Sequence, residues 1–325
     1  MDNKLLIDKY RPRNIDNIIL NDILKSKITS FLVNNLIPNI IISGPPGTGK
    51  TSLILLIAKH IYKENYKEAV LELNASDNRG IEIINNNITY FCKKRITDKN
   101  NNPIPKLIIF DEADNITNKV QNIISKLLED NTINTKFAFT CNNSLNIIEA
   151  LQSRCLMIYI PLLTHEQINN KLIDICKKEN IEYTDEALKL LSMNANGDIR
   201  YAINNIEVIY YGFGKIDKNN ICELCHQPQP DIIINLIQEC VYKNIKKVIT
   251  IIENLKKKGY CSNDILLTII NILQYVKIDE EIRINFNRIL NESYVHICDG
   301  IDTNLQLYGC ISRIILFMQT YKKIV

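Results

Sequence analysis

A glycine-rich segment of eight residues constrains the fold of this chain more than any other feature. Residues 44–51 fit the phosphate-binding loop pattern G-x-x-x-x-G-K-[ST] in full, and they lie between a short apolar run and an amphipathic stretch. Glycines in such a loop let backbone N–H groups face phosphate oxygens, and the start of the following helix adds a favourable dipole. The sequence therefore predicts a strand, a phosphate-binding loop and a helix, in that order.

Two side chains of this loop have distinct expected roles. Lys50 is expected to reach the β and γ phosphates of ATP, and the Thr51 hydroxyl can ligate Mg²⁺. A plain Gly/Pro turn is the alternative, and the full match between a strand and a helix argues against it. The residues expected to contact ATP here are Gly44, Pro45, Pro46, Gly47, Thr48, Gly49, Lys50, Thr51 and Ser52.

An acidic segment at the end of another apolar run completes the expected site. Residues 107–114 read LIIFDEAD, and ligands of open parallel sheets bind where the strands end. Asp111 is expected to hold Mg²⁺, directly or through water, and Glu112 could activate the attacking water as a general base. The letters DEAD also mark a class of RNA helicases, but the other motifs of that class are not found in this sequence. We therefore reject an RNA helicase.

Short apolar runs alternate with amphipathic stretches between residues 40 and 160, which is typical of a parallel sheet with crossover helices. The runs are almost continuously apolar, as expected for strands that are covered on both faces. Pro161 ends this pattern. The five expected strands are Asn39–Ile42, Ala69–Leu73, Leu107–Phe110, Phe137–Cys141 and Leu156–Ile160.

From Thr164 onward the sequence predicts only helices. Thr164 and Gln167 form a capping-box pattern. A helix is expected over 198–210, and residues 212–214 (GFG) are expected to act as its C-terminal stop. A proline-containing segment at 227–230 is interpreted as a linker before several further helices. The expected domains are an α/β nucleotide-binding domain over 1–162, a small helical lid over 163–227 and an all-helical domain over 228–325.

Composition is typical of an ordinary globular protein, with 39 basic and 36 acidic side chains and a net charge of +3. This balance neither indicates nor excludes a nucleic-acid partner. No apolar run is long enough to span a bilayer and no signal peptide is recognised, so we expect no membrane association and reduced cysteines. Cys222, Cys225 and His226 form a CxxCH pattern. We attribute that pattern to chance, because no second CxxC or paired His lies nearby.

Two polar residues are weaker candidates. Asn142 follows an apolar run and is suited to orient water or the γ-phosphate, although an Asn at a strand end is more often a turn residue. Arg200 lies in the first turn of an expected helix, where an Arg alone is more often a surface charge. The residues by themselves leave both alternatives open.

Four segments resemble replication factor C, a clamp-loader family of AAA+ ATPases. Residues 8–12 (DKYRP) resemble its N-terminal box, 72–81 (ELNASDNRGI) a segment of its small subunits, 152–155 (QSRC) its SRC box, and 197–204 its sensor 2 helix. The similarity covers essentially the whole chain. It implies an α/β fold with a P-loop AAA+ parallel-sheet domain, a small helical lid and a C-terminal helical collar that joins subunits in a ring.

The resemblance also implies roles for individual residues. Asn142 matches sensor 1 and Arg200 matches sensor 2. Arg154 matches the arginine finger, which in clamp loaders reaches the ATP of the neighbouring subunit. An Arg supplied from outside stabilises transition-state charge and makes hydrolysis depend on assembly. The residues that match adenine contacts are Ile7, Arg11 and Ile19.

The family implies three partners and a nuclear role in DNA replication and repair. The partners are the other subunits of a heteropentamer, the PCNA sliding clamp, and primer–template DNA, whose phosphates are contacted without regard to sequence. Arg79 and Lys126 match DNA-contacting positions, and Gln121 retains part of that pattern. Asn85 and Ser125 stand where many relatives carry basic residues, so the DNA track is expected to be thinner than usual.

Two regions have alternative interpretations. Residues 88–95 are expected to contact the clamp, but their apolar side chains could equally belong to the core. The apolar helices over 264–276 and 305–318 could form the collar interface or an intramolecular core.

Particular sequence features oppose two alternative functions. A nucleotide-binding scaffold with little turnover of its own is opposed by the intact set of Lys50, Thr51, Asp111, Glu112 and Asn142. A different AAA+ machine, such as a motor of the Holliday-junction type, is opposed by the SRC box and by the helical C-terminal domain, in which no winged DNA-binding module is evident.

Overall fold

The computed structural model describes residues 5–34, 37–75, 88–97, 103–130, 134–224, 228–301 and 303–321. The chain forms two compact units, Met1–Ile216 and Asp217–Val325. The first unit holds a parallel sheet and the helices that follow it, and the second is helical. The expected boundary between residues 162 and 163 therefore lies inside the first unit and stays a prediction.

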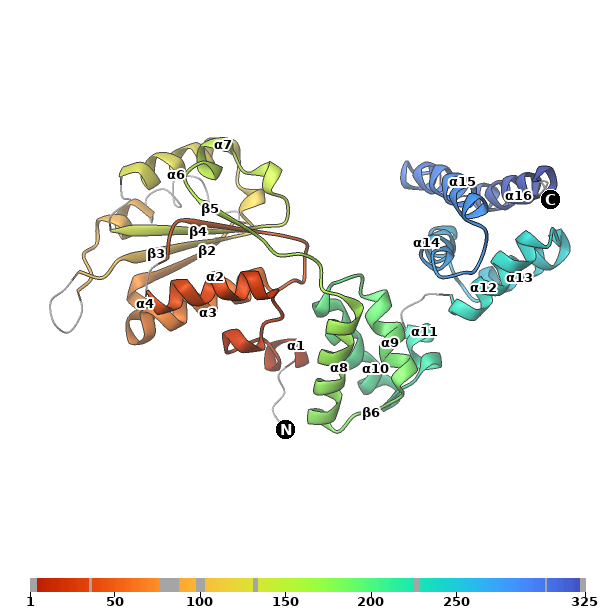
Figure 1. Cartoon of the computed structure of the whole chain (residues 1–325), viewed down its shortest axis with the longest axis horizontal. Coiled ribbons are helices and arrows are strands. Elements are labelled where there is room, and N and C mark those ends of the chain that lie inside the picture. The colour runs from red at the N-terminus through yellow and green to blue at the C-terminus, as the bar shows by residue number, and fades with distance from the viewer. Residues whose placement is uncertain are drawn as a thin grey trace. The chain divides into compact units, whose positions relative to one another are not determined.

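A parallel five-stranded sheet organises the first unit (Figure 1). Its strand order is β2-β3-β4-β1-β5. All neighbouring strands run parallel, so they end at one common edge. The predicted parallel sheet and its five strands are confirmed, with small shifts of the strand ends. The strands are β1 Ile40–Ser43, β2 Val70–Asn74, β3 Lys106–Asp111, β4 Thr135–Cys141 and β5 Leu156–Tyr159.

Helices cover both faces of this sheet (Figure 1). Ile40 and Ile42 pack with α2 and α3 on one face, whereas Ile41 packs with α6 on the other. Because successive strand residues point to opposite faces, a strand covered on both sides must be apolar throughout. The helices of this region are α1 Leu6–Lys9, α2 Asp22–Val33, α3 Lys50–Tyr62, α4 Tyr66–Ala69, α6 Asn118–Asp130 and α7 Glu149–Gln152.

Two expectations for this region are refined. β5 is not covered on both faces, because among the described residues it is an edge strand paired with β1 alone, and three of its four residues are exposed. Residues 88–93 are helical, and Ile88 and Cys92 are buried in the core beside α6. The core interpretation therefore holds for these two side chains, whereas Tyr90 between them is 75 % exposed.

The first unit ends in three helices, α8 His165–Glu179, α9 Asp185–Asn194 and α10 Ile199–Phe213. The predicted capping box of Thr164 and Gln167 opens α8, and Gly214, at φ 74°, ends α10 as predicted. The expectation of helices alone was wrong. Strand β6 (Glu182–Tyr183) pairs with β7 (Lys215–Ile216) in parallel, and two residues per strand are too few to leave a recognisable alternation in the sequence.

The second unit is built from helices around one apolar core. Ile265 and Ile269 of α14 and Ile311 and Ile314 of α16 are buried in this core, so part of both apolar faces is intramolecular. No helix among the described residues is long and apolar enough to cross a membrane. The helices of the second unit are α11 Lys218–Leu224, α12 Pro230–Val241, α13 Ile245–Lys257, α14 Ser262–Leu273, α15 Glu280–Cys298 and α16 Asn304–Thr320.

Candidate nucleotide-binding site

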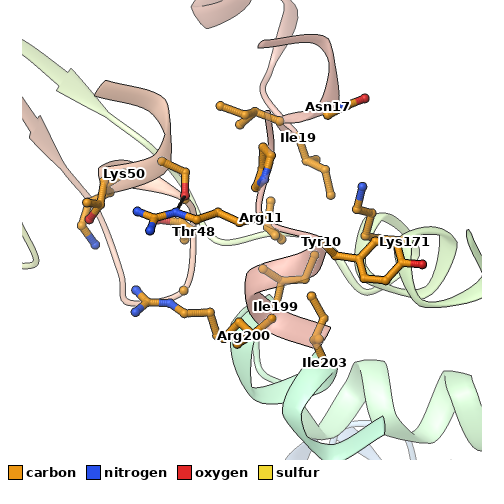
Figure 2. A pocket seen from close by; sticks show the side chains of 18 of the residues that line it. Tyr10, Arg11, Asn17, Ile19, Thr48, Lys50, Lys171, Ile199, Arg200 and Ile203 are labelled. Atoms are coloured by element: carbon orange, nitrogen blue, oxygen red, sulfur yellow. Dashed lines mark hydrogen bonds between the residues drawn. The ribbon is translucent and has the colours of Figure 1, made fainter. Parts of the chain in front are cut away.

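Residues that follow adjacent strands meet the phosphate-binding loop at the common edge of the sheet. A cavity of about 310 Å³ is lined by part of this loop, the start of α3, Asp111 at the end of β3, the N-terminal segment and the first turn of α10 (Figure 2). Asn142 is close to the loop but does not line the cavity. Gly44, Pro45 and Pro46 belong to the loop but do not line this cavity. The motif residues that line it are Gly47, Thr48, Gly49, Lys50, Thr51, Ser52 and Asp111.

Close contacts explain two glycines of the loop. A Cβ atom at Gly47 would lie 1.8 Å from Asp198 Oδ1, and one at Gly44 would lie 2.2 Å from the carbonyl oxygen of Ile160. Gly47 also has a φ of 73°, which disfavours any side chain. Asp198 caps α10 by accepting a hydrogen bond from the Arg200 backbone N–H at 2.8 Å. The loop thus packs directly against the start of α10, which brings Arg200 to the cavity.

The Lys50 ammonium is held within the loop. Its Nζ donates to the carbonyl oxygens of Gly44 at 2.7 Å and Pro45 at 2.8 Å, and to Asn142 Oδ1 at 2.8 Å. Asn142 directly follows β4, so the fold brings these two predicted residues together. Burial lowers the pKa of Lys50, and the charge of Arg200 lowers it further. These neighbouring cations make this end of the cavity suitable for phosphate groups.

Thr51 and Asp111 form the expected pair of metal-binding side chains. Thr51 Oγ1 donates to Asp111 Oδ1 at 2.8 Å. Hydroxyl and carboxylate oxygens are hard donors of the kind that Mg²⁺ prefers, so the pair fits a magnesium ion. Thr140, which the sequence analysis missed, also donates to Asp111 Oδ1. The signal for it was strand register, since Phe110 of β3 lies opposite Phe139 of β4.

Glu112 has a left-handed backbone conformation, with φ 54° and ψ 45°. Its N–H donates to Thr140 Oγ1 at 3.2 Å, and its carboxylate accepts a hydrogen bond from Asn115 Nδ2 at 3.3 Å. Asp114 accepts a hydrogen bond from the backbone N–H of Asn142 at 3.1 Å. The acidic segment is thus hydrogen-bonded to Thr140 of β4 and to Asn142, which directly follows β4. The Glu112 side chain is exposed and does not itself line the cavity.

The other end of the cavity combines aliphatic side chains with Tyr10, Asn17 and Lys171, and we refer to it as the base end. Arg11, which lines the cavity, also reaches the first turn of α3 directly after the loop, because its Nε donates to Ser52 Oγ at 3.3 Å. Figure 2 shows the guanidinium groups of Arg11 and Arg200 directed towards the loop. An aliphatic slot beside cationic groups suits a flat base that carries phosphates. The apolar lining consists of Ile7, Ile18, Ile19, Leu163, Ile199 and Ile203, of which Ile7 and Ile19 were predicted.

Two carboxylates, one on α10 and one on α8, hold the N-terminal segment against these helices. Glu207, buried in α10, accepts a hydrogen bond from the Leu6 backbone N–H at 3.0 Å. Glu179, at the end of α8, accepts hydrogen bonds from Lys9 Nζ at 2.9 Å and from the Tyr10 hydroxyl. Burial and the bond to Glu179 raise the pKa of Tyr10. Neither carboxylate was predicted from the sequence.

Arg154 lies outside the cavity. Its Nη1 donates to the carbonyl oxygen of Ala150 at 2.7 Å, and its Nη2 lies 2.6 Å from Glu129 Oε1. Both side chains of this ion pair are exposed, at 38 % for Arg154 and 50 % for Glu129. Arg154 is therefore not a ligand of the cavity in its own chain.

The expected DNA contacts have mixed outcomes. Arg79 and Asn85 lie outside the described residues, as do Cys225 and His226, so the expectations for them stay predictions. Lys126 is exposed on α6. The expected contact of Gln121 with DNA is wrong, because this residue is 1 % exposed and its Nε2 donates to two backbone carbonyls at 2.9 Å. Its amide stabilises the fold and is not available to DNA.

Comparisons with known proteins agree with this geometry. Residues 40–162 match the ATPase family associated with various cellular activities (AAA), and residues 228–313 match the replication factor C C-terminal domain. The chain is 34 % identical to replication factor C subunit 2 of Arabidopsis thaliana, over 98 % of this chain and 96 % of that protein. It is 38 % identical to a putative replication factor C small subunit of Acanthamoeba polyphaga mimivirus, over 96 % and 97 %.

A solved structure supports the fold alone. The RuvB Holliday junction branch migration motor of Thermotoga maritima superimposes with a TM-score of 0.55 at 14 % identity, over 79 % of this chain and 90 % of that protein. The AAA domain implies nucleotide binding and ATP hydrolysis. Because the sequence relatives extend over nearly the full length, the chain belongs to the replication factor C family of AAA ATPases.

Proposed function

We propose that this chain is an ATP-hydrolysing subunit of a heteropentameric clamp loader that opens the PCNA sliding clamp and places it on primer–template DNA. The observation that carries this proposal is the grouping of Lys50, Thr51, Asp111 and Asn142 at one sheet edge, with Arg154 exposed outside the cavity. A site that is nearly complete in one chain, and an Arg that faces away from it, suit hydrolysis between neighbouring subunits.

The proposed chemistry is transfer of the γ-phosphoryl group of ATP to water. Thr51 and Asp111 would hold Mg²⁺, which when bound offsets charge on the phosphate oxygens. Lys50 and Arg200 bind the phosphates and stabilise the charge that develops on them. Glu112 accepts a proton from the attacking water.

The remaining residues of the proposed site position the nucleotide. Asn142 orients the attacking water or the γ-phosphate, since its side chain already accepts a hydrogen bond from Lys50. Ile7 and Ile19 pack on the adenine, and Arg11 lies between the base end and the loop. Ile199 and Ile203 extend this apolar surface from α10.

Arg154 is proposed as the arginine finger for the ATP of the neighbouring subunit. It lies on the surface, and its partner Glu129 is also exposed, so a phosphate group could compete for the guanidinium. Hydrolysis would then require an assembled ring, because the arginine finger for each ATP comes from the neighbouring subunit and not from the chain that binds the nucleotide.

The proposed partners follow the family. Arg79 and Lys126 would contact DNA phosphates, which positions the protein without selecting a sequence. Residues 88–95 would contribute to clamp contact through the exposed Tyr90 rather than through the buried Ile88. Residues 139–144, 153–155 and 258–260 favour the small subunit numbered 2 in animals and 4 in budding yeast. The expected location is the nucleus.

The proposal is tested by ATP turnover in the assembled complex. This chain is co-expressed with its loader partners, and turnover is measured with and without clamp and primed DNA. Wild type is compared with Lys50→Ala and Arg154→Ala. Lys178→Ala is a matched control, because it removes a cation from another exposed ion pair, with Asp174 at 2.8 Å.

Stimulation by clamp and DNA, reduced by Lys50→Ala and by Arg154→Ala but not by Lys178→Ala, is the expected result. ATP turnover that does not change when clamp and primed DNA are added would contradict the clamp-loader assignment. The chain would then be an AAA ATPase with another role. Full stimulation of Arg154→Ala in an intact complex would remove the arginine-finger role alone.

A further inference from the structure

Thr140 occupies an unusual place for a hydroxyl group. It is 1 % exposed, and it is the last residue but one of β4, a strand whose other central residues form an apolar core with β3. A valine would satisfy the packing needs of such a position, whereas a buried hydroxyl must find hydrogen-bond partners. Both of its partners belong to the acidic segment at the end of β3, namely Asp111 and Glu112.

The direction of each hydrogen bond is fixed by chemistry. The backbone N–H of Glu112 can only donate, so Thr140 Oγ1 accepts there, at 3.2 Å. A hydroxyl has one proton, and Thr140 therefore uses it to donate a hydrogen bond to Asp111 Oδ1. One side chain thus holds the carboxylate of the first acidic residue and the backbone of the second.

Both held groups need such support. Asp111 Oδ1 also accepts the Thr51 hydroxyl at 2.8 Å, so Thr140 fixes the carboxylate beside the proposed metal ligand. Glu112 has φ 54° and ψ 45°, a sparsely populated conformation for a residue with a side chain. The bond from its N–H to Thr140 favours that conformation, which sets the direction in which the Glu112 side chain leaves the backbone.

We propose that Thr140 is a positioning residue that aligns Asp111 for Mg²⁺ and Glu112 for the attacking water. This inference rests on the proposed roles of Asp111 and Glu112 in ATP hydrolysis. A role in packing alone would need the methyl group and the volume of Thr140, whereas a positioning role needs its hydroxyl. The two roles therefore predict different effects for substitutions that keep one and remove the other.

The test compares Thr140→Val, which keeps the volume, with Thr140→Ser, which keeps the hydroxyl. Binding of a fluorescent ATP analogue to the full chain is titrated with Mg²⁺, turnover is measured in the assembled complex, and thermal melting is recorded. Thr135→Val is the matched control, since Thr135 is buried at the opposite end of β4. If Thr140→Val does not fold, Thr140→Ala removes the hydroxyl without adding volume.

Thr140→Val is expected to raise the Mg²⁺ concentration for half-maximal binding about tenfold and to lower turnover about ten- to hundredfold, as losses of groups that orient metal ligands do. Binding without Mg²⁺ should be unchanged, and Thr140→Ser should stay close to wild type. The proposal is overturned if Thr140→Val keeps the wild-type Mg²⁺ dependence, or if Thr140→Ser loses as much as Thr140→Val. The Mg²⁺ titration needs neither clamp nor DNA, so its outcome is independent of whether the clamp-loader assignment holds.

Discussion

The phosphate end and the base end of the cavity are held together in different ways. At the phosphate end, Lys50, Asp111 and Asn142 lie next to strand ends of one hydrogen-bonded sheet. At the base end, a short N-terminal segment lies on α8 and α10. Leu6 and Glu207, which bond there, are 201 positions apart in the chain.

This difference separates two properties of the site. The sheet fixes the groups proposed to carry out the reaction, whereas hydrogen bonds to Glu207 and Glu179 fix the segment proposed to hold the base. Substitutions at the phosphate end should therefore lower turnover even at saturating ATP. Substitutions at the base end should lower ATP affinity and leave turnover at saturation largely intact.

The largest expected effect comes from Glu112→Gln. Loss of a general base lowers turnover about a hundredfold or more, while ATP affinity should be kept, because the Glu112 side chain does not line the cavity. Steady-state turnover in the assembled complex and equilibrium binding of ATP measure the two effects. Glu186→Gln is the control, because Glu186 is an exposed carboxylate on α9. A parallel loss of affinity would break the distinction between the two ends.

A smaller effect of the opposite kind is expected for Glu207→Leu. The Leu6 N–H loses its acceptor, and a hydrogen bond to a charged group contributes about 1.5–3 kcal/mol, so ATP binding should weaken about tenfold or somewhat more, at about 1.4 kcal/mol per factor of ten. Turnover at saturating ATP should be retained. Glu207→Gln keeps an acceptor oxygen and should stay near wild type. Turnover that falls as far as affinity would show that the base end also governs the reaction.

The sequence predicts the phosphate end well because its residues are set by local pattern. A glycine-rich loop between a strand and a helix identifies Lys50 and Thr51, and an acidic pair after an apolar run identifies Asp111. Parallel strands then bring these residues to one edge without further information. The family resemblance added Arg200, which the structure places in the cavity.

The residues that were missed depend on contacts that leave no local pattern. Thr140 is identified only by the register of β4 against β3. Glu207 is a single carboxylate among the apolar residues that α10 buries, so no pattern marks it. Gln121 was misassigned to DNA because a polar residue on a helix gives no sign that its amide is buried. The two-residue strands β6 and β7 are too short for any periodicity.

The smallest expected effect concerns Glu179 and tests the base end by pH. Hydrogen bonds from Lys9 and then from Tyr10 hold the pKa of Glu179 below its usual range, against a smaller opposing effect of burial. Because the folded-state pKa is lowered, the charged carboxylate stabilises the fold fully above its unfolded pKa, and this stabilisation disappears as the pH falls through the lowered folded pKa. The contribution should stay below about 1 kcal/mol, since Lys9 is 45 % exposed.

The difference in melting temperature between wild type and Glu179→Gln should therefore be small near neutral pH and vanish in acid. A difference that does not change with pH would mean that Glu179 anchors the segment by shape rather than by charge, and the base end would then resemble the phosphate end more closely than we infer.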